Sequence, residues 1–192
     1  MKKHNLVIQY NAPATLSFAL LSFAVLALGW LTKGASTMRL FSVYRSPLSD
    51  PLTYLRFFLH VLGHSNLAHY SGNITLMLVL GPNLEERYGS KTILWAMVLT
   101  AFVSGLLHWI LFPSVALLGA SGIVFMMILM ASLGGSRGGG IPLTLILVFI
   151  IYVGGEIYDG LTVRDNISQL THIIGGIFGA VLGILWRKGK RG

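Results

Sequence analysis

The chain has no cysteine and few charged residues. Among its 192 residues, the absence of cysteine excludes disulfide bonds, thiol nucleophiles and cysteine-ligated metal sites. Charged residues make up only 10% of the sequence, whereas typical soluble domains contain about 25%. Hydrophobic residues make up 54%, so there is too little polar surface to cover a soluble domain. The composition therefore predicts an integral membrane protein with a single domain over residues 1–192.

Basic residues outnumber acidic ones, and the formal net charge at pH 7 is +8. They flank apolar runs instead of gathering on one face, which disfavours nucleic acid as a partner. The basic tail at residues 187–191 is typical of an anchor to anionic lipid. We therefore expect the lipid bilayer, and not a nucleic acid, to be the partner of these charges.

Six apolar runs are each long enough to cross a hydrocarbon core about 30 Å thick, which takes roughly 20 helical residues. Backbone groups in lipid must be paired within the spanning segment, so we expect helices and not strands. The stretch 36–63 is too polar to span, and we expect a structured outer loop there. The prediction is an all-α bundle of six transmembrane helices. Its spans are residues 14–31, 67–84, 92–111, 115–133, 142–160 and 169–186.

An alternative interpretation of the first run is a secretory signal peptide, because Lys2 and Lys3 precede it and small residues follow at 34–36. The run at 14–31 is longer than the roughly 7–15 apolar residues of a signal core. Five further spans also follow it. We therefore favour a membrane helix over a cleaved signal.

Lysine and arginine residues predict how the spans are oriented. With the N-terminus inside, nine of the 14 Lys and Arg residues lie on the inner side and the other five on the outer side. Because cytoplasmic loops are enriched in positive charge, we expect both termini in the cytoplasm. The protein would then be a multi-pass protein of a bacterial-type cell membrane.

This orientation brings several polar residues to one depth of the membrane. The second, fourth and sixth spans all run from outside to inside, and each carries polar residues near its first turns. Such residues are costly inside a bilayer and indicate a functional site. They are His69 and Asn73, Ser121, and His172.

Ser121 lies between Gly119 and Gly122, at the start of an apolar run. One interpretation is a helix cap, because serine is a favoured N-cap residue. The other is a nucleophile, because the glycines permit close backbone approach and leave the hydroxyl uncrowded. The free N–H groups of a helix N-terminus would also suit a developing oxyanion.

His172 shares one helix face with Gly175, Gly179 and Gly183. Small residues on one face let a neighbouring helix approach closely. If the neighbour is the fourth span, His172 lies beside Ser121 and can act as its base. The alternative is a packing motif with an incidental histidine.

Other histidines suggest a metal site, since His60 and His64 are four residues apart. The His-Glu-x-x-His pattern of zinc proteases is absent, and no carboxylate lies within the apolar part of a span, since Glu156 and Asp159 lie at an outer end, so we expect no metal and no cofactor. His69 and Asn73 are also four residues apart and can both donate hydrogen bonds. That arrangement favours an oxyanion hole.

Three blocks of sequence resemble the rhomboid family of intramembrane serine proteases, over about residues 56–183. Each block is modest evidence alone, but together, in this order, they are specific. The first holds His60, His69 and Asn73 and runs into Leu-Glu-Glu-Arg-Tyr-Gly-Ser at 84–90, the second is Gly-Ala-Ser-Gly at 119–122, and the third is His-Ile-Ile-Gly-Gly-Ile-Phe-Gly at 172–179.

The resemblance implies a six-helix core and a Ser–His dyad, with Ser121 as nucleophile and His172 as general base. It implies that His69, Asn73 and the backbone N–H of Ser121 bind the oxyanion, beside Gly119. The expected activity is that of a serine endopeptidase that cleaves transmembrane segments of membrane-protein substrates through an acyl-enzyme.

Residues outside the dyad also fit the resemblance, with two departures. Arg56 matches an outer-loop arginine of the family, and Glu85 and Arg87 match a structural pair at the inner end of the second span. Leu55 stands where the family usually has tryptophan. Phe125 stands where a tyrosine commonly stacks on the catalytic histidine, and it keeps the aromatic ring.

Three other functions are weighed against the protease, and one of them, a purely structural membrane protein, is disfavoured by the four polar residues at one depth. A non-catalytic rhomboid-like protein would bind transmembrane helices, but such relatives typically lack the serine or the histidine. A transporter is disfavoured because there is no inverted repeat and no charge at mid-membrane depth.

Overall fold

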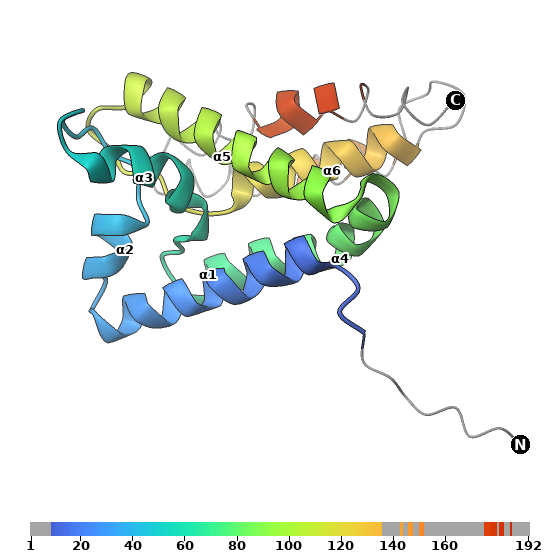
Figure 1. Ribbon diagram of the computed structural model, residues 1–192, viewed down its shortest axis with the longest axis horizontal. Helices are drawn as coiled ribbons and strands as arrows, with labels where there is room; N and C mark the ends of the chain where they lie inside the picture. The colour runs from blue at the N-terminus through green and yellow to red at the C-terminus, as the bar shows by residue number, and fades with distance from the viewer. Residues whose placement is uncertain are drawn as a thin grey trace, which may run out of the picture.

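The computed structural model describes residues 9–135 and, beyond them, residues 143, 146, 147, 150, 151, 175–179, 181, 182 and 185. In this part of the chain the regular structure is helical, which confirms the all-α prediction there (Figure 1). The helices are α1 Pro13–Leu31, α2 Ala35–Leu40, α3 Pro51–Leu59, the 3-10 helix η1 His60–Leu62, α4 Leu67–Tyr88, α5 Ser90–Leu111 and α6 Ser121–Gly135.

Two of the described helices, α1 and α5, are long and apolar enough to cross a membrane. The helix α6 is equally apolar but shorter. Most of the expected fifth and sixth spans, at 142–160 and 169–186, lies outside the described residues.

Local sequence explains where several helices begin. Proline at the first helical position suits a helix start, since its missing N–H has no partner there, and both α1 and α3 begin with proline. The side chain of Asp50 accepts a hydrogen bond from Leu52 N and caps α3. Asn66 caps α4 by accepting from His69 N at 2.8 Å. The expected loop at 36–63 thus contains most of α2, all of α3 and η1.

The expected fourth span, at 115–133, needs correction, because its helix begins only at Ser121. The preceding residues are not helical: Val43 and Leu117 exchange two backbone hydrogen bonds of 2.8 Å, and Gly119 N donates to His60 O at 3.0 Å. Hydropathy could not reveal this, because an apolar non-helical segment and an apolar helix have the same composition.

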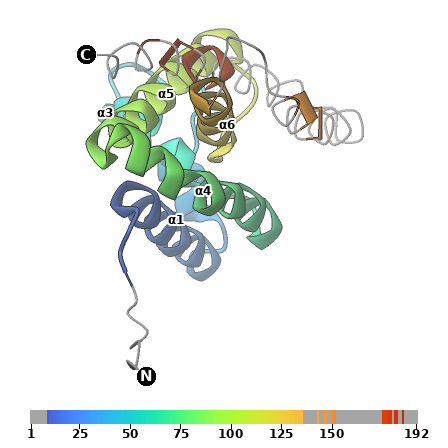
Figure 2. The same ribbon diagram turned by 90° about the vertical axis from the view of Figure 1, so that its right-hand side faces the viewer.

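The helix α6 lies at the centre of the described structure, and every residue from 121 to 128 is buried. It packs against α4 and α5, and α4 in turn separates it from α1 (Figures 1 and 2). Unbranched methionines fill much of this core, and Met77, Met126, Met127 and Met130 are all fully buried. The central position of α6 carries its first residue, Ser121, into the interior.

Candidate active site

Ser121 is the first helical residue of α6, and its exposed fraction is 9%. The carbonyl of Ala120 accepts the Val124 N–H at 3.0 Å, so Ala120 and not Ser121 occupies the capping position. The Ser121 N–H belongs to the first turn of the helix, where N–H groups have no partner within the helix. A hydroxyl and a free backbone donor therefore occur together at the positive end of the α6 dipole.

His69, in the first turn of α4, lies directly against the segment that leads into Ser121. A Cβ atom built on Gly119 would lie 2.7 Å from His69 Nε2 and 2.8 Å from its Cε1. Gly119 also has a φ of +120°, which side-chain-bearing residues rarely adopt. Glycine is thus required here for two reasons, the backbone conformation and the imidazole ring.

Ser65 and His64 contact the His69 ring on the sides that do not face Gly119. Ser65 Oγ lies 3.2 Å from His69 Nδ1, and the His64 ring packs edge-on against it with a centroid distance of 5.0 Å. One turn along α4, the buried Asn73 donates from Nδ2 to the His69 carbonyl at 3.0 Å. Asn73 and His69 thus lie one turn apart on α4, as their spacing predicts.

Glycines from the last described segment pack against α6, backbone to backbone. A Cβ on Gly175 would overlap the carbonyl of Gly122, and a Cβ on Gly179 would lie 2.8 Å from Met126 Cα. A Cβ on the intervening Gly176 would lie 2.5 Å from the Phe125 ring. Close helix contact of this kind is what a row of small residues permits. His172, three residues before Gly175, lies outside the described residues.

His60 connects the α3 region to the segment before Ser121. Its side chain is fully buried, with Nδ1 3.2 Å from Arg56 O and Nε2 3.4 Å from Ser104 Oγ. Burial lowers the pKa of His60 from 6.5 to about 4, and burial, together with the nearby His69, does the same for His64. Both imidazoles are therefore neutral at physiological pH. In the described part of the chain, no three His, Asp or Glu side chains converge as metal ligands would.

Two buried charged residues hold the frame around these groups. Arg56 pairs with Asp50 at 3.2 Å and donates from Nε to Arg39 O at 2.8 Å, which ties α3 to α2. Glu85 accepts from Thr15 N and Thr15 Oγ1, both at 2.7 Å, and from Ala14 N at 3.0 Å. This carboxylate caps the N-terminus of α1, a role that the sequence did not reveal because about 70 residues separate the partners.

The remaining residues expected at the site are placed as follows. Arg87 lies over the ring of Tyr88, with 5.5 Å from its Cζ to the ring centroid. Phe125 is buried in the core, one turn after Ser121. Leu55 is about half exposed on α3.

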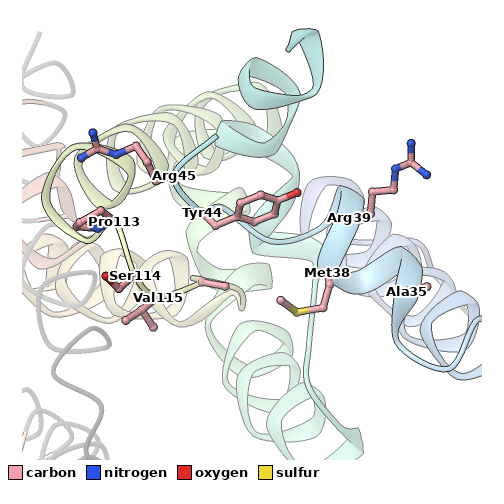
Figure 3. A pocket seen from close by; sticks show the side chains of 9 residues that line it. Ala35, Met38, Arg39, Tyr44, Arg45, Pro113, Ser114 and Val115 are labelled. Atoms are coloured by element: carbon pink, nitrogen blue, oxygen red, sulfur yellow. The ribbon is translucent and has the colours of Figure 1, made fainter. Parts of the chain in front are cut away.

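A pocket of about 530 Å³, lined by neither Ser121 nor His69, lies between α2 and residues 113–116 (Figure 3). Its lining includes Met38 and Arg39 of α2, Tyr44 and Arg45 of the following loop, and Ser114. Arg45 is held at the edge of this pocket by a 2.7 Å hydrogen bond to Ile110 O and by the ring of Trp109 beneath it. The pocket therefore belongs to the loop region and not to the serine.

Comparison with known protein families gives one match. The family model described as Rhomboid domain matches residues 51–189, which begins at α3 and includes α4, α5, α6 and the glycines at 175–179. A search of curated proteins found no match.

Proposed function

The chain belongs to the rhomboid family and is an integral membrane protein, and from this premise we propose that it is an intramembrane serine endopeptidase. In this proposal residues 1–192 form a single domain of six spans with both termini in the cytoplasm. Ser121 is the nucleophile, and His172 is its general base. The substrates are transmembrane segments of other membrane proteins.

The observation that carries the proposal is the contact between His69 of α4 and Gly119, two residues before α6. There the His69 imidazole lies beside the backbone that leads into Ser121, and the Ser121 N–H lies at a helix N-terminus. This proximity supports the proposal that donors from two elements stabilise a substrate carbonyl oxygen as it becomes negatively charged. The packing of Gly175 on Gly122 supports the assignment of His172, because it brings the last described helical segment against the first turn of α6.

In this proposal the reaction proceeds as follows. His172 takes the Ser121 proton as Oγ attacks the substrate carbonyl carbon. His69, Asn73 and the Ser121 N–H stabilise the oxyanion, with Gly119 leaving room for the imidazole. His172 then protonates the leaving amine, and water hydrolyses the acyl-enzyme to restore Ser121. No cofactor takes part in these steps.

The test is cleavage of a transmembrane substrate by the purified protein in lipid, compared with Ser121→Ala and His172→Ala. We expect cleavage by the wild type only, and a fluorophosphonate should label Ser121 in the wild type but not in Ser121→Ala. Ser71→Ala is a matched control, because this exposed α4 serine donates to Ala68 O of its own helix and to no other group in the described part of the chain. Equal product from the wild type and both dyad variants would refute the proposal. Retained substrate binding without any cleavage would instead support a non-catalytic rhomboid-like protein.

A further inference from the structure

We propose that Ser65 is a positioning residue that sets the tautomer of His69, so that Nε2 carries the proton offered to the oxyanion. The expected effect of this tautomer on catalysis rests on the proposed function. The hydrogen bonds that support it join only Ser65, Asn66 and His69.

The first step is the orientation of the Asn66 side chain. Its Oδ1 accepts a hydrogen bond from the His69 backbone N–H at 2.8 Å. A backbone N–H can only donate, so the atom facing it must be the amide oxygen. The amide nitrogen is then at the other end of the group, where Nδ2 lies 3.4 Å from Ser65 Oγ. Asn66 therefore donates to Ser65.

The second step is the direction of the Ser65 hydroxyl. Ser65 is exposed, its oxygen accepts from Asn66, and its single proton is left to donate. His69 Nδ1 lies 3.2 Å away and is the acceptor that the described structure offers. A neutral imidazole whose Nδ1 accepts a hydrogen bond carries its proton on Nε2.

The third step is where this proton lies. The Nε2 edge of the His69 ring faces Gly119, at 2.7 Å from the position of an ideal Cβ, and Gly119 is two residues before Ser121. The opposite edge is held by Ser65, and the His64 ring packs against the imidazole edge-on. The proton on Nε2 is therefore directed toward the serine end of α6.

Asn66 connects two roles in this arrangement. It is the N-cap of α4, and the same amide orients the Ser65 hydroxyl. Helix capping and the tautomer of His69 can be separated by substitution, because aspartate caps a helix about as well as asparagine but has no N–H to donate.

The first experiment measures substrate cleavage by Ser65→Ala and Ser65→Thr. Ser65→Ala should lower kcat by about tenfold with little change in KM, which is less than the roughly 10²–10³-fold loss when such a donor is removed outright. Ser65→Thr restores a hydroxyl and should recover the wild-type kcat. Ser71→Ala, on the same helix, should remain at the wild-type value. An unchanged kcat in Ser65→Ala would overturn the inference.

The second experiment uses Asn66→Asp. The carboxylate still accepts from His69 N, so α4 stays capped, but it also accepts the Ser65 proton and withdraws it from His69 Nδ1. We expect wild-type thermal stability together with a kcat lowered about as much as in Ser65→Ala. If capping were the only role of Asn66, this variant would cleave at the wild-type rate, and that result would contradict the inference.

The third experiment reports the tautomer without any substrate. In protein labelled with ¹⁵N-histidine, nitrogen NMR at about pH 8 distinguishes a protonated from an unprotonated ring nitrogen, and His69→Gln identifies the signal. We expect the Nδ1 of His69 to be unprotonated in the wild type and Ser65→Thr, and partly protonated in Asn66→Asp. A proton on Nδ1 in the wild type would refute the assignment. Because this readout needs no cleavage, it decides the tautomer even if the protein proves not to be a protease.

Discussion

Gly119→Ala is the sharpest perturbation that the structure suggests. The new Cβ would lie 2.7 Å from His69 Nε2, closer than real Cβ atoms approach other heavy atoms, and the φ of +120° would strain any side-chain-bearing residue. The strained backbone alone costs about 1–3 kcal/mol. The imidazole would also have to move away from the serine end of α6. Losing the His69 donor corresponds to roughly 2.7–4 kcal/mol of transition-state stabilisation, so kcat should fall by about 10²–10³-fold.

Substitutions at two other glycines distinguish the effect of backbone strain from the effect of the clash with the His69 ring. Gly34 has a φ of +87° with nothing within 4 Å of its Cβ position, so Gly34→Ala should lower stability without lowering kcat. Gly72, on α4, also has open space around its Cβ position and no positive φ, so Gly72→Ala should be neutral or stabilising by up to about 1 kcal/mol.

The assay is thermal unfolding in detergent together with cleavage kinetics in lipid. We expect Gly119→Ala to lose both stability and kcat, and Gly34→Ala to lose only stability. In the double variant Gly119→Ala/His69→Ala the ring is gone, so the two effects on kcat should not add. A Gly119→Ala protein with wild-type kcat, or additive effects in the double variant, would refute the idea that His69 and Ser121 act together across Gly119.

Three further predictions concern the frame around the site. Glu85→Ala removes the carboxylate that accepts three hydrogen bonds from the first turn of α1, so the unfolding free energy should fall by about 1–3 kcal/mol; a wild-type melting temperature would contradict this. Stability should fall as pH drops from 6.5 towards 4, because unfolded His60 binds a proton that the folded state excludes; this amounts to roughly 3 kcal/mol, and a His60→Gln variant should show a smaller pH slope. Gly175→Ala should separate two backbones that touch at Gly122 and lower both stability and cleavage, whereas the exposed Ile177→Ala, on the same helical segment, should leave cleavage unchanged.

Much of the candidate site could be predicted from sequence, because each of its residues differs in polarity or size from its immediate neighbours in the chain. Polar residues in apolar runs are rare, and His69, Asn73 and Ser121 each stand out for that reason. The glycines around Ser121 also predicted a close approach, and Gly119 and Gly122 each face another element in the structure.

What the sequence could not predict depends on partners that are distant along the chain or on backbone hydrogen bonds. The non-helical segment before Ser121 is held by the bridge between Val43 and Leu117, which involves only backbone groups and no distinctive side chain. Glu85 and Thr15 contact each other but are 70 residues apart in the chain. No helical or strand periodicity relates residues at that separation, so the sequence does not reveal the contact. The link between Ser65 and His69 was equally hidden, because no sequence pattern marked Ser65 or Asn66.

The bonds between Glu85 and the first turn of α1 also set an order of assembly during biosynthesis. A ribosome makes α1 long before it makes Glu85, so the N–H groups of Ala14 and Thr15 must first be solvated by water or lipid headgroups. The Glu85 carboxylate, which accepts these hydrogen bonds in the folded protein, becomes available only when the C-terminal end of α4 has left the ribosome. The docking of α1 against α4 through these hydrogen bonds therefore waits until the chain has been made at least as far as residue 85.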